Sequence, residues 1–306
     1  MLTIAQIRKI AQQSGARDIA NVETDVILTY LLQLFHEQGI VEHVAFKGGT
    51  MLRKMVFGPR GRLSTDLDFT LRTDISDEDL MEMMLDALGK PYCGLSFRFD
   101  RDKDWYFADN SLAANPVCVH AENDKGVKIK LQVSLRERPV LPVRAVSQIA
   151  QDYFTLLPFK PAPIPSLAYE EAVAEKIRAA SQRSKIRDLH DLSEIAGKPL
   201  NRDLIRALAV IKLWESSGDN LDYGQFADRI TNSGDYDFGE LTNLLRKDQR
   251  PNVKDMIRRV VDGFRFLGQM TELEWTLAQD KKRRRRAEIE TLKAEAAKRA
   301  GEAART

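Results

Sequence analysis

Cysteine and histidine are scarce in this chain of 306 residues. Its two cysteines, Cys93 and Cys118, lie far apart and form no CxxC pattern, so we expect two reduced thiols and no disulfide. The four histidines form no HxH or HExxH cluster. This spacing argues against a zinc site.

Long apolar runs are also missing. No stretch approaches the roughly 20 apolar residues that a membrane-spanning helix requires. The charged segment 1–20 has no apolar core of the kind found in signal peptides. We therefore expect a cytoplasmic protein without a membrane segment. Its 43% hydrophobic and 30% charged residues are typical of a globular chain, and its length suits two domains.

The charge is unevenly distributed along the chain. Residues 279–306 contain ten Lys or Arg against five Asp or Glu, so this tail carries +5 and the rest of the chain −3. A basic tail can neutralise the phosphates of a nucleic acid. The alternative interpretation is a charged, solvated helix end.

The hydrophobic pattern changes along the chain from mixed elements to helices only. Four prolines, at 158, 161, 163 and 165, mark the change. The expected organisation is a mixed domain 1–157, a proline-rich linker 158–166, a helical domain 167–278 and a basic charged tail 279–306.

Apolar periodicity predicts the individual elements. The predicted helices of the first part are 3–15, 21–39, 51–56 and 77–88. The predicted strands are 44–46, 63–71, 95–99, 116–120 and 127–135. The predicted helices of the second part are 167–184, 188–196, 201–216, 222–231, 237–248 and 252–278.

Two carboxylates stand out in the predicted strand 63–71. Alternation places Asp66 and Asp68 on one face and Leu67 and Phe69 on the other. Two acids on one strand face repel each other, and Mg²⁺ is a cation that such oxygen ligands bind together with substrate phosphates. The pair is therefore a candidate metal site.

A glycine turn precedes this strand. Lys47-Gly48-Gly49-Thr50 ends one predicted strand and begins a helix. At such a turn backbone N–H groups can contact phosphate, because glycine allows close approach of the backbone.

These motifs together resemble a known family. Phe46-Lys-Gly-Gly-Thr-Met-Leu-Arg-Lys54 followed by Arg62-Leu-Ser64-Thr-Asp66-Leu-Asp68-Phe69 is similar to the pattern FKGGTxL…RxSxDxDF of the AbiEii/AbiGii-type toxin nucleotidyltransferases. Glu175-Lys176, Arg183, Lys185 and Arg187-Asp188-Leu-His-Asp191-Leu192 resemble the EK…RxKxRDxxDL signature of the same family.

The resemblance implies an α+β fold, with a polymerase-β-like nucleotidyltransferase mixed sheet flanked by helices in domain 1–157 and a C-terminal helical domain. It also implies an Mg²⁺-dependent toxin of a toxin–antitoxin or abortive-infection system, which transfers a nucleotide from an NTP to the 3′ end of tRNA and blocks translation. The implied partners are the NTP, tRNA and a cognate antitoxin protein.

The resemblance and the residue types suggest roles for the site residues. Asp66 and Asp68 are expected to hold Mg²⁺, and Lys176 to stabilise charge on the transferring group, supported by Arg183 and Arg187. Asp191 is a base, a metal ligand or a positioner of Lys176. Its rival Asp188 lies further round a continuous helix. The residues expected to bind the nucleotide are Lys47, Gly48, Gly49, Thr50, Ser64, Arg183 and Arg187.

One departure from the superfamily concerns a third carboxylate, which a neighbouring strand often supplies. The exposed face of the predicted strand 127–135 presents Lys128, Lys130, Gln132 and Ser134, none of them acidic. Either one metal suffices, or Asp191 or Glu137 enters the site. Two alternative functions stay open: nucleotidyl transfer to a protein or small molecule, and NTP or RNA binding without catalysis.

Overall fold

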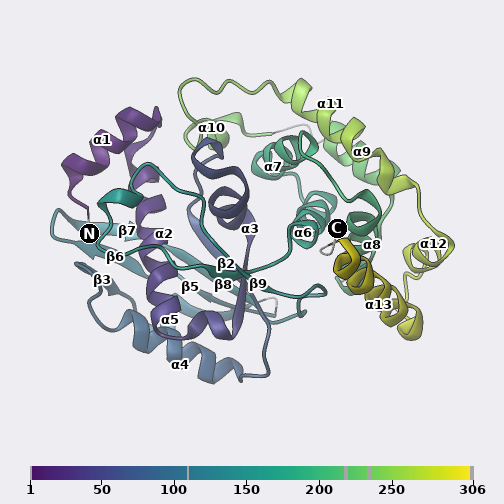
Figure 1. Cartoon of the computed structure of the whole chain (residues 1–306), viewed down its shortest axis with the longest axis horizontal. Helices are drawn as coiled ribbons and strands as arrows, with labels where there is room; N and C mark the ends of the chain where they lie inside the picture. The colour runs from purple at the N-terminus through teal and green to yellow at the C-terminus, as the bar shows by residue number, and fades with distance from the viewer. Residues whose placement is uncertain (1, 109, 217–219, 233–235, 304–306) are drawn as a thin grey trace. The chain divides into compact units, whose positions relative to one another are not determined.

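The computed structural model of the chain describes residues 2–108, 110–216, 220–232 and 236–303 (Figure 1). They form two compact units. The first contains 1–139, 143–167 and 242–249, and the second contains 140–142, 168–241 and 250–306. The domain boundaries expected from the sequence remain a prediction. Among the described residues, no helix has both the length and the apolar character needed to cross a membrane.

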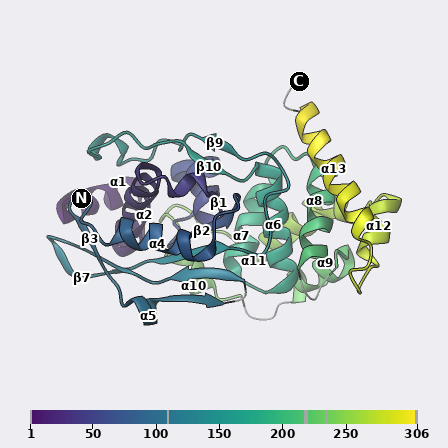
Figure 2. The ribbon, with the colours of Figure 1, turned by 90° about the horizontal axis from the view of Figure 1, so that it is seen from below.

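The first unit is built on two sheets. Its larger sheet has the strand order β4-β5-β8-β2-β1-β10-β9, and a smaller sheet has the order β3-β6-β7. Figures 1 and 2 label strands of both sheets. The strands are β1 Val44–Lys47, β2 Asp66–Leu71, β3 Leu95–Arg98, β4 Trp105–Ala108, β5 Ser111–Ala114, β6 Val117–His120, β7 Asn123–Lys128, β8 Lys130–Ser134, β9 Arg144–Val146 and β10 Ile164–Ser166.

Capping residues mark the ends of two helices of the first unit. Thr3 caps the first helix and Gly15 ends it in the left-handed region, while Ser76 caps the helix after β2. The helices are α1 Ile4–Ser14, α2 Ile19–Glu37, α3 Gly48–Met51, α4 Asp77–Leu88 and α5 Arg101–Asp104; η1 Ile40–Glu42, η3 Gly58–Arg60 and η4 Phe154–Leu156 are 3₁₀ turns, and η2 Leu52–Phe57 is π-helical.

The core lies between α2 and one face of the large sheet. Phe69 of β2 contacts Phe46 of β1 and Phe35 of α2, with ring centroids 5.4 and 6.0 Å apart. The strand β2 pairs antiparallel with β1 and parallel with β8, so the sheet is mixed. This confirms the α+β fold class expected from the sequence.

The second unit is helical. Its helices are α6 Tyr169–Gln182, α7 Ile186–Ala196, α8 Arg202–Glu215, α9 Tyr223–Asn232, α10 Phe238–Thr242, α11 Val253–Gly263, the 3₁₀ turn η5 Arg265–Gly268, α12 Glu272–Ala278 and α13 Arg286–Ala303. The basic tail is therefore largely helical, and Ile289, Leu292 and Ala296 of α13 are buried. Residues 304–306 of the expected tail lie outside the described residues.

Three expectations about the elements were wrong. The strand expected over 127–135 is divided between β7 and β8, because the Ile129 amide donates to the Pro116 carbonyl between the two sheets. The helix expected over 237–248 ends at Thr242, and residues 242–249 instead belong to the first unit, where the Leu63 amide donates to the Leu244 carbonyl. The helix expected over 252–278 is interrupted after Gly263, η5 begins at Arg265, and a new helix starts after the Thr271 cap.

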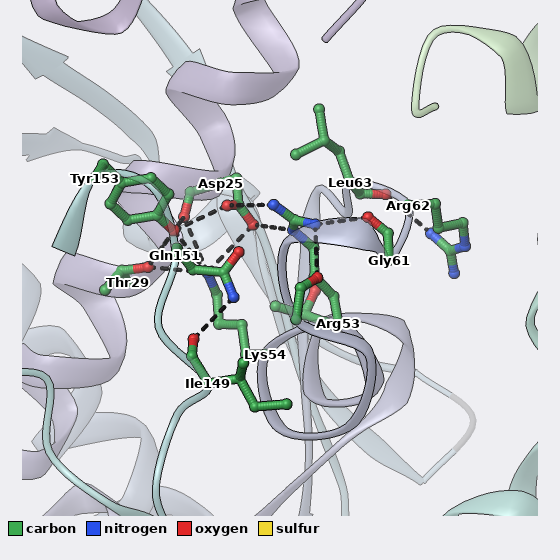
Figure 3. A network of polar contacts seen from close by, with 12 residues as sticks. Asp25, Thr29, Arg53, Lys54, Gly61, Arg62, Leu63, Ile149, Gln151 and Tyr153 are labelled. Atoms are coloured by element: carbon green, nitrogen blue, oxygen red, sulfur yellow. Dashed lines mark hydrogen bonds and ion pairs between the residues drawn. The ribbon is translucent and has the colours of Figure 1, made fainter. Parts of the chain in front are cut away.

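A buried network of charges joins α2 to the helix that follows the glycine turn (Figure 3). Arg53 Nε and Lys54 Nζ lie 3.0 and 3.2 Å from Asp25 Oδ1, and the Tyr153 hydroxyl donates to Asp25 Oδ2 at 2.8 Å. Arg53 also donates to the carbonyl of Gly61, and Lys54 to the hydroxyl of Thr29.

The electrostatics of this network follow from its burial. Burial alone would raise the pKa of Asp25, but the adjacent Arg53 and Lys54 outweigh it and hold the pKa well below its usual range. Burial lowers the pKa of Lys54 to about 8, although Asp25 opposes this shift. Each buried charge of this cluster therefore depends on its oppositely charged partners to remain ionised.

We expect Asp25→Asn to destabilise the protein by about 3–5 kcal/mol, because it leaves two buried cations without their anion. The free energy of unfolding in urea measures this loss. The matched control is Asp86→Asn, which removes an exposed carboxylate of α4 and should change the unfolding free energy by less than about 0.5 kcal/mol. Equal stability of the two variants would contradict the role of Asp25.

The same carboxylate gives a pH dependence. The pKa of Asp25 in the folded protein lies below its ordinary value of 3.8, so in acid the unfolded chain takes up this proton first. The contribution of Asp25 is present above that value and is lost as the pH falls below roughly 4. Unfolding free energies measured at about pH 3 and about pH 7 should differ less in Asp25→Asn than in wild type. An identical pH slope in both proteins would refute this assignment.

Candidate active site

Asp66 and Asp68 lie on one face of β2 at the beginning of the strand. Both are half-buried, whereas Leu67 and Phe69 on the opposite face are buried in the core. The alternation expected from the sequence is therefore present in the structure. The apolar residues fix the strand, and the two carboxylates point away from the core.

The glycine turn packs directly against these carboxylates. Gly48 has φ +81°, and a Cβ at this position would lie 2.4 Å from Asp68 Oδ2. A Cβ at Gly49 would lie 2.5 Å from an Nη atom of Arg62 and 3.4 Å from Ser64 Oγ. Only glycine fits at Gly48, both because its backbone is left-handed and because the carboxylate occupies the space.

Two hydroxyl residues complete this part of the site. Thr50 is buried and its hydroxyl donates to the backbone carbonyl of Asp66, which ties α3 to β2. Ser64 is also buried, two residues before the strand. Lys47 of β1 is directly in register with Asp68 of β2. The first unit thus brings together Asp66 and Asp68 with the other predicted residues, namely Lys47, Gly48, Gly49, Thr50 and Ser64.

The strand beside β2 supplies an amide where a third acid was sought. Gln132 of β8 is directly in register with Asp68, and Lys130 with Asp66. In the described part of the chain, no group of three or more His, Cys, Asp or Glu residues could hold a metal ion. Glu137 is buried, and its backbone carbonyl accepts the hydroxyl of Thr70.

The remaining predicted residues form a charge cluster within the second unit. Lys176 of α6 is buried, and its Nζ lies 2.9 Å from Asp188 Oδ1 and 2.8 Å from Asp191 Oδ2 of α7. Burial would raise the pKa of Asp188, but Lys176 and Arg183 outweigh it and lower the pKa. Both aspartates therefore contact the Lys176 ammonium.

The helix that would carry Lys176 and Arg187 together is interrupted. α6 ends at Gln182 and α7 begins at Ile186, with extended backbone at Arg183 and Lys185. The side chain of Arg183 is 59% exposed and binds Asp188, while Arg187 pairs with Glu240. A count of 100° per residue along one continuous helix consequently misplaces Asp188, which contacts Lys176 as closely as Asp191 does.

Sequence reasoning left several charged residues without a role. The guanidinium of Arg62 lies against Gly49, and Arg53 and Lys54 hold the helix after the turn through Asp25. Their position in the FKGGTxLRK and RxSxDxDF segments is the only signal for them, because the partner Asp25 is far away in the sequence.

Comparisons with known proteins agree with this geometry. The family described as nucleotidyl transferase AbiEii toxin, type IV toxin–antitoxin system, matches residues 30–279. A search of curated proteins found no match. The structure of MenT4, a nucleotidyltransferase toxin from Mycobacterium tuberculosis, is similar with a TM-score of 0.77 and 24% identity, covering 97% of this chain and 99% of that one.

A Helicobacter pylori protein, JHP933, is more distant. It has a TM-score of 0.47 and 17% identity, covering 78% of this chain and 90% of its own. The likeness to MenT4 establishes the fold, and the family match extends over most of the chain, including the carboxylates, the glycine turn and the charge cluster of the second unit. The protein accordingly belongs to the AbiEii nucleotidyltransferase toxins of type IV toxin–antitoxin systems.

Proposed function

We propose that this toxin transfers a nucleotide from an NTP to the 3′ end of tRNA in the cytoplasm, releases pyrophosphate and thereby blocks translation. The observation that carries the proposal is the packing of Gly48 against Asp68, beside a second carboxylate on the same strand face. A turn that presents backbone N–H groups beside two acids suits a metal–triphosphate substrate.

The residues present fit an Mg²⁺ ion. The ion commonly uses one or two carboxylates and takes its other ligands from substrate phosphates and water, so Asp66 and Asp68 suffice as protein ligands. When bound, Mg²⁺ would offset the negative charge of the phosphates during transfer. Gln132 can offer its amide oxygen beside them but cannot act as a base.

The surrounding groups have distinct proposed tasks. The backbone N–H groups of Gly48 and Gly49 and the hydroxyl of Ser64 bind phosphate oxygens. The Thr50 hydroxyl, which is donated to the Asp66 carbonyl, keeps the turn and the strand in register. Lys47 and the guanidinium of Arg62 add positive charge to this turn. Nucleotidyl transfer depends mainly on positioning and electrostatics, which such a set provides.

The cluster of the second unit has a proposed role in charge stabilisation. Lys176 would stabilise charge that develops on the transferring group, and Asp188 and Asp191 fix its ammonium. Asp191 remains a base, a metal ligand or a positioner in this proposal, and its contact with Lys176 supports the positioning role. Arg183 and Arg187 are proposed to support the nucleotide. A cognate antitoxin protein is the proposed regulator.

The deciding experiment incubates the purified protein with Mg²⁺, each labelled NTP in turn and total tRNA. Label in tRNA that is lost in Asp66→Ala would establish the reaction and its acceptor. Asp66-dependent label in protein or small molecules would assign a different acceptor. NTP binding without transfer to any acceptor would leave a non-catalytic binding protein and overturn the proposal.

We expect Asp66→Asn and Asp68→Asn each to lower transfer roughly 1000-fold, because metal-ion charge stabilisation is worth several kcal/mol. Initial rates with labelled NTP, measured over a range of Mg²⁺ concentrations, test this. Asp86→Asn, with its exposed carboxylate on α4, serves as the control and should keep the wild-type rate. Full activity of either site variant would exclude the proposed metal ligands.

We also expect Gly48→Ala to lower transfer about 100-fold, since the new Cβ must displace the Asp68 carboxylate and misplacing a catalytic group by about 1 Å costs about that much. Gly39→Ala is the matched control. Gly39 has a similar φ of +73°, but a Cβ there meets nothing within 4 Å. The control should lose stability and keep its rate, so equal rates in both variants would disprove the role of the contact.

A further inference from the structure

A row of directly paired residues runs across the large sheet from the carboxylates to its edge. Asp68 of β2 pairs with Gln132 of β8, Gln132 with Ala113 of β5, and Ala113 with Tyr106 of β4. Directly paired residues point to the same face of a sheet. Tyr106 therefore lies on the carboxylate face, three strand spacings or about 14 Å from Asp68.

On the central strands β2 and β8, the accessible side chains of this face lie at one end. At the other end Thr70 and Ser134 are buried, and the Thr70 hydroxyl donates to the carbonyl of Glu137 in the segment after β8. At the open end Asp66 and Asp68 are half-buried and Lys130 is exposed. In the row of Asp68, Gln132 is half-buried, Ala113 is buried and Tyr106 at the edge is exposed.

The side chains along this strip suit a nucleotide. Ala113 between Gln132 and Tyr106 has a small side chain and is buried, and Lys130 adds a cation in register with Asp66. Tyr106 is 42% exposed on β4, which is the terminal strand of the sheet. Asn115 contacts the Tyr106 hydroxyl at 3.5 Å. An exposed aromatic ring can stack on the flat face of any base.

The neighbouring residue provides an internal comparison. Phe107 is 52% exposed. Its row across the sheet, however, continues through Leu112 and Val133 to the buried Phe69. Phe107 therefore points to the core face, away from the carboxylates. A lone exposed aromatic residue is ordinary on a protein surface. What distinguishes Tyr106 from Phe107 is that it shares a row with Asp68.

We propose that the ring of Tyr106 is a stacking platform for the nucleobase of a substrate whose reacting group is held at Asp66 and Asp68. This inference rests on the proposed nucleotidyl transfer and adds a binding residue to it. The base belongs to the NTP or to the terminal nucleotide of the RNA acceptor, and the two sources share the same chemistry of recognition.

The test compares Tyr106→Ala, Tyr106→Phe and Phe107→Ala in the full chain, with thermal melting to verify that each is folded. In Tyr106→Ala we expect the KM of one substrate to rise about 10-fold, as for the loss of one stacked base, with a small change in kcat. Tyr106→Phe keeps the ring and should retain the wild-type KM, and Phe107→Ala should behave as wild type.

The outcomes separate the sources and the hypotheses. A rise in the KM for the NTP assigns the base to the donor, and a rise in the KM for tRNA assigns it to the acceptor. Unchanged KM values for both substrates in Tyr106→Ala, or an equal rise in Phe107→Ala, overturn the proposal. If the wild type transfers no label, nucleotidyl transfer fails, but equilibrium binding of NTP and tRNA to the same variants still tests stacking by the same criteria.

Discussion

Asp25 is removed from water together with the consecutive cations Arg53 and Lys54, and such burial costs several kcal/mol per ion unless each charge has partners. In the first unit each charge does have partners, from α2, from the turn at Gly61 and from Tyr153. The cluster therefore fixes the helix that begins at the glycine turn. Because Gly48 packs against Asp68, the position of this proposed metal ligand depends on charges buried some distance from it.

Local patterns predicted much of the first unit and of its site. The alternation of Asp66, Leu67, Asp68 and Phe69 was sufficient to place two acids on one face. The glycine turn was also recognised from the sequence. What could not be predicted was the reason for Gly48, since the atom that excludes a side chain there belongs to a different strand.

Longer-range features were missed for the same physical reason. The run from Val127 to Leu135 alternates without interruption, yet its two halves join different sheets, and alternation contains no information about which partner a strand selects. Similarly, the prediction for Lys176 and Asp191 counted residues along one continuous helix, although the backbone becomes extended at Arg183 and Lys185. The break allows α7 to return toward α6, which is how two aspartates reach one ammonium.

Gln132 lies directly beside Asp68 in the sheet, and this affects the electrostatic energy of the site when no substrate is bound. Three adjacent acids would repel one another strongly whenever no cation is bound, and such repulsion raises the free energy of the resting enzyme. A neutral amide at this position avoids this repulsion and still provides an oxygen atom. Since glutamine and glutamate have nearly the same shape, the fold could host either, and under the proposed metal binding the residue at 132 would set the balance between the stability of the site without a cation and its affinity for one.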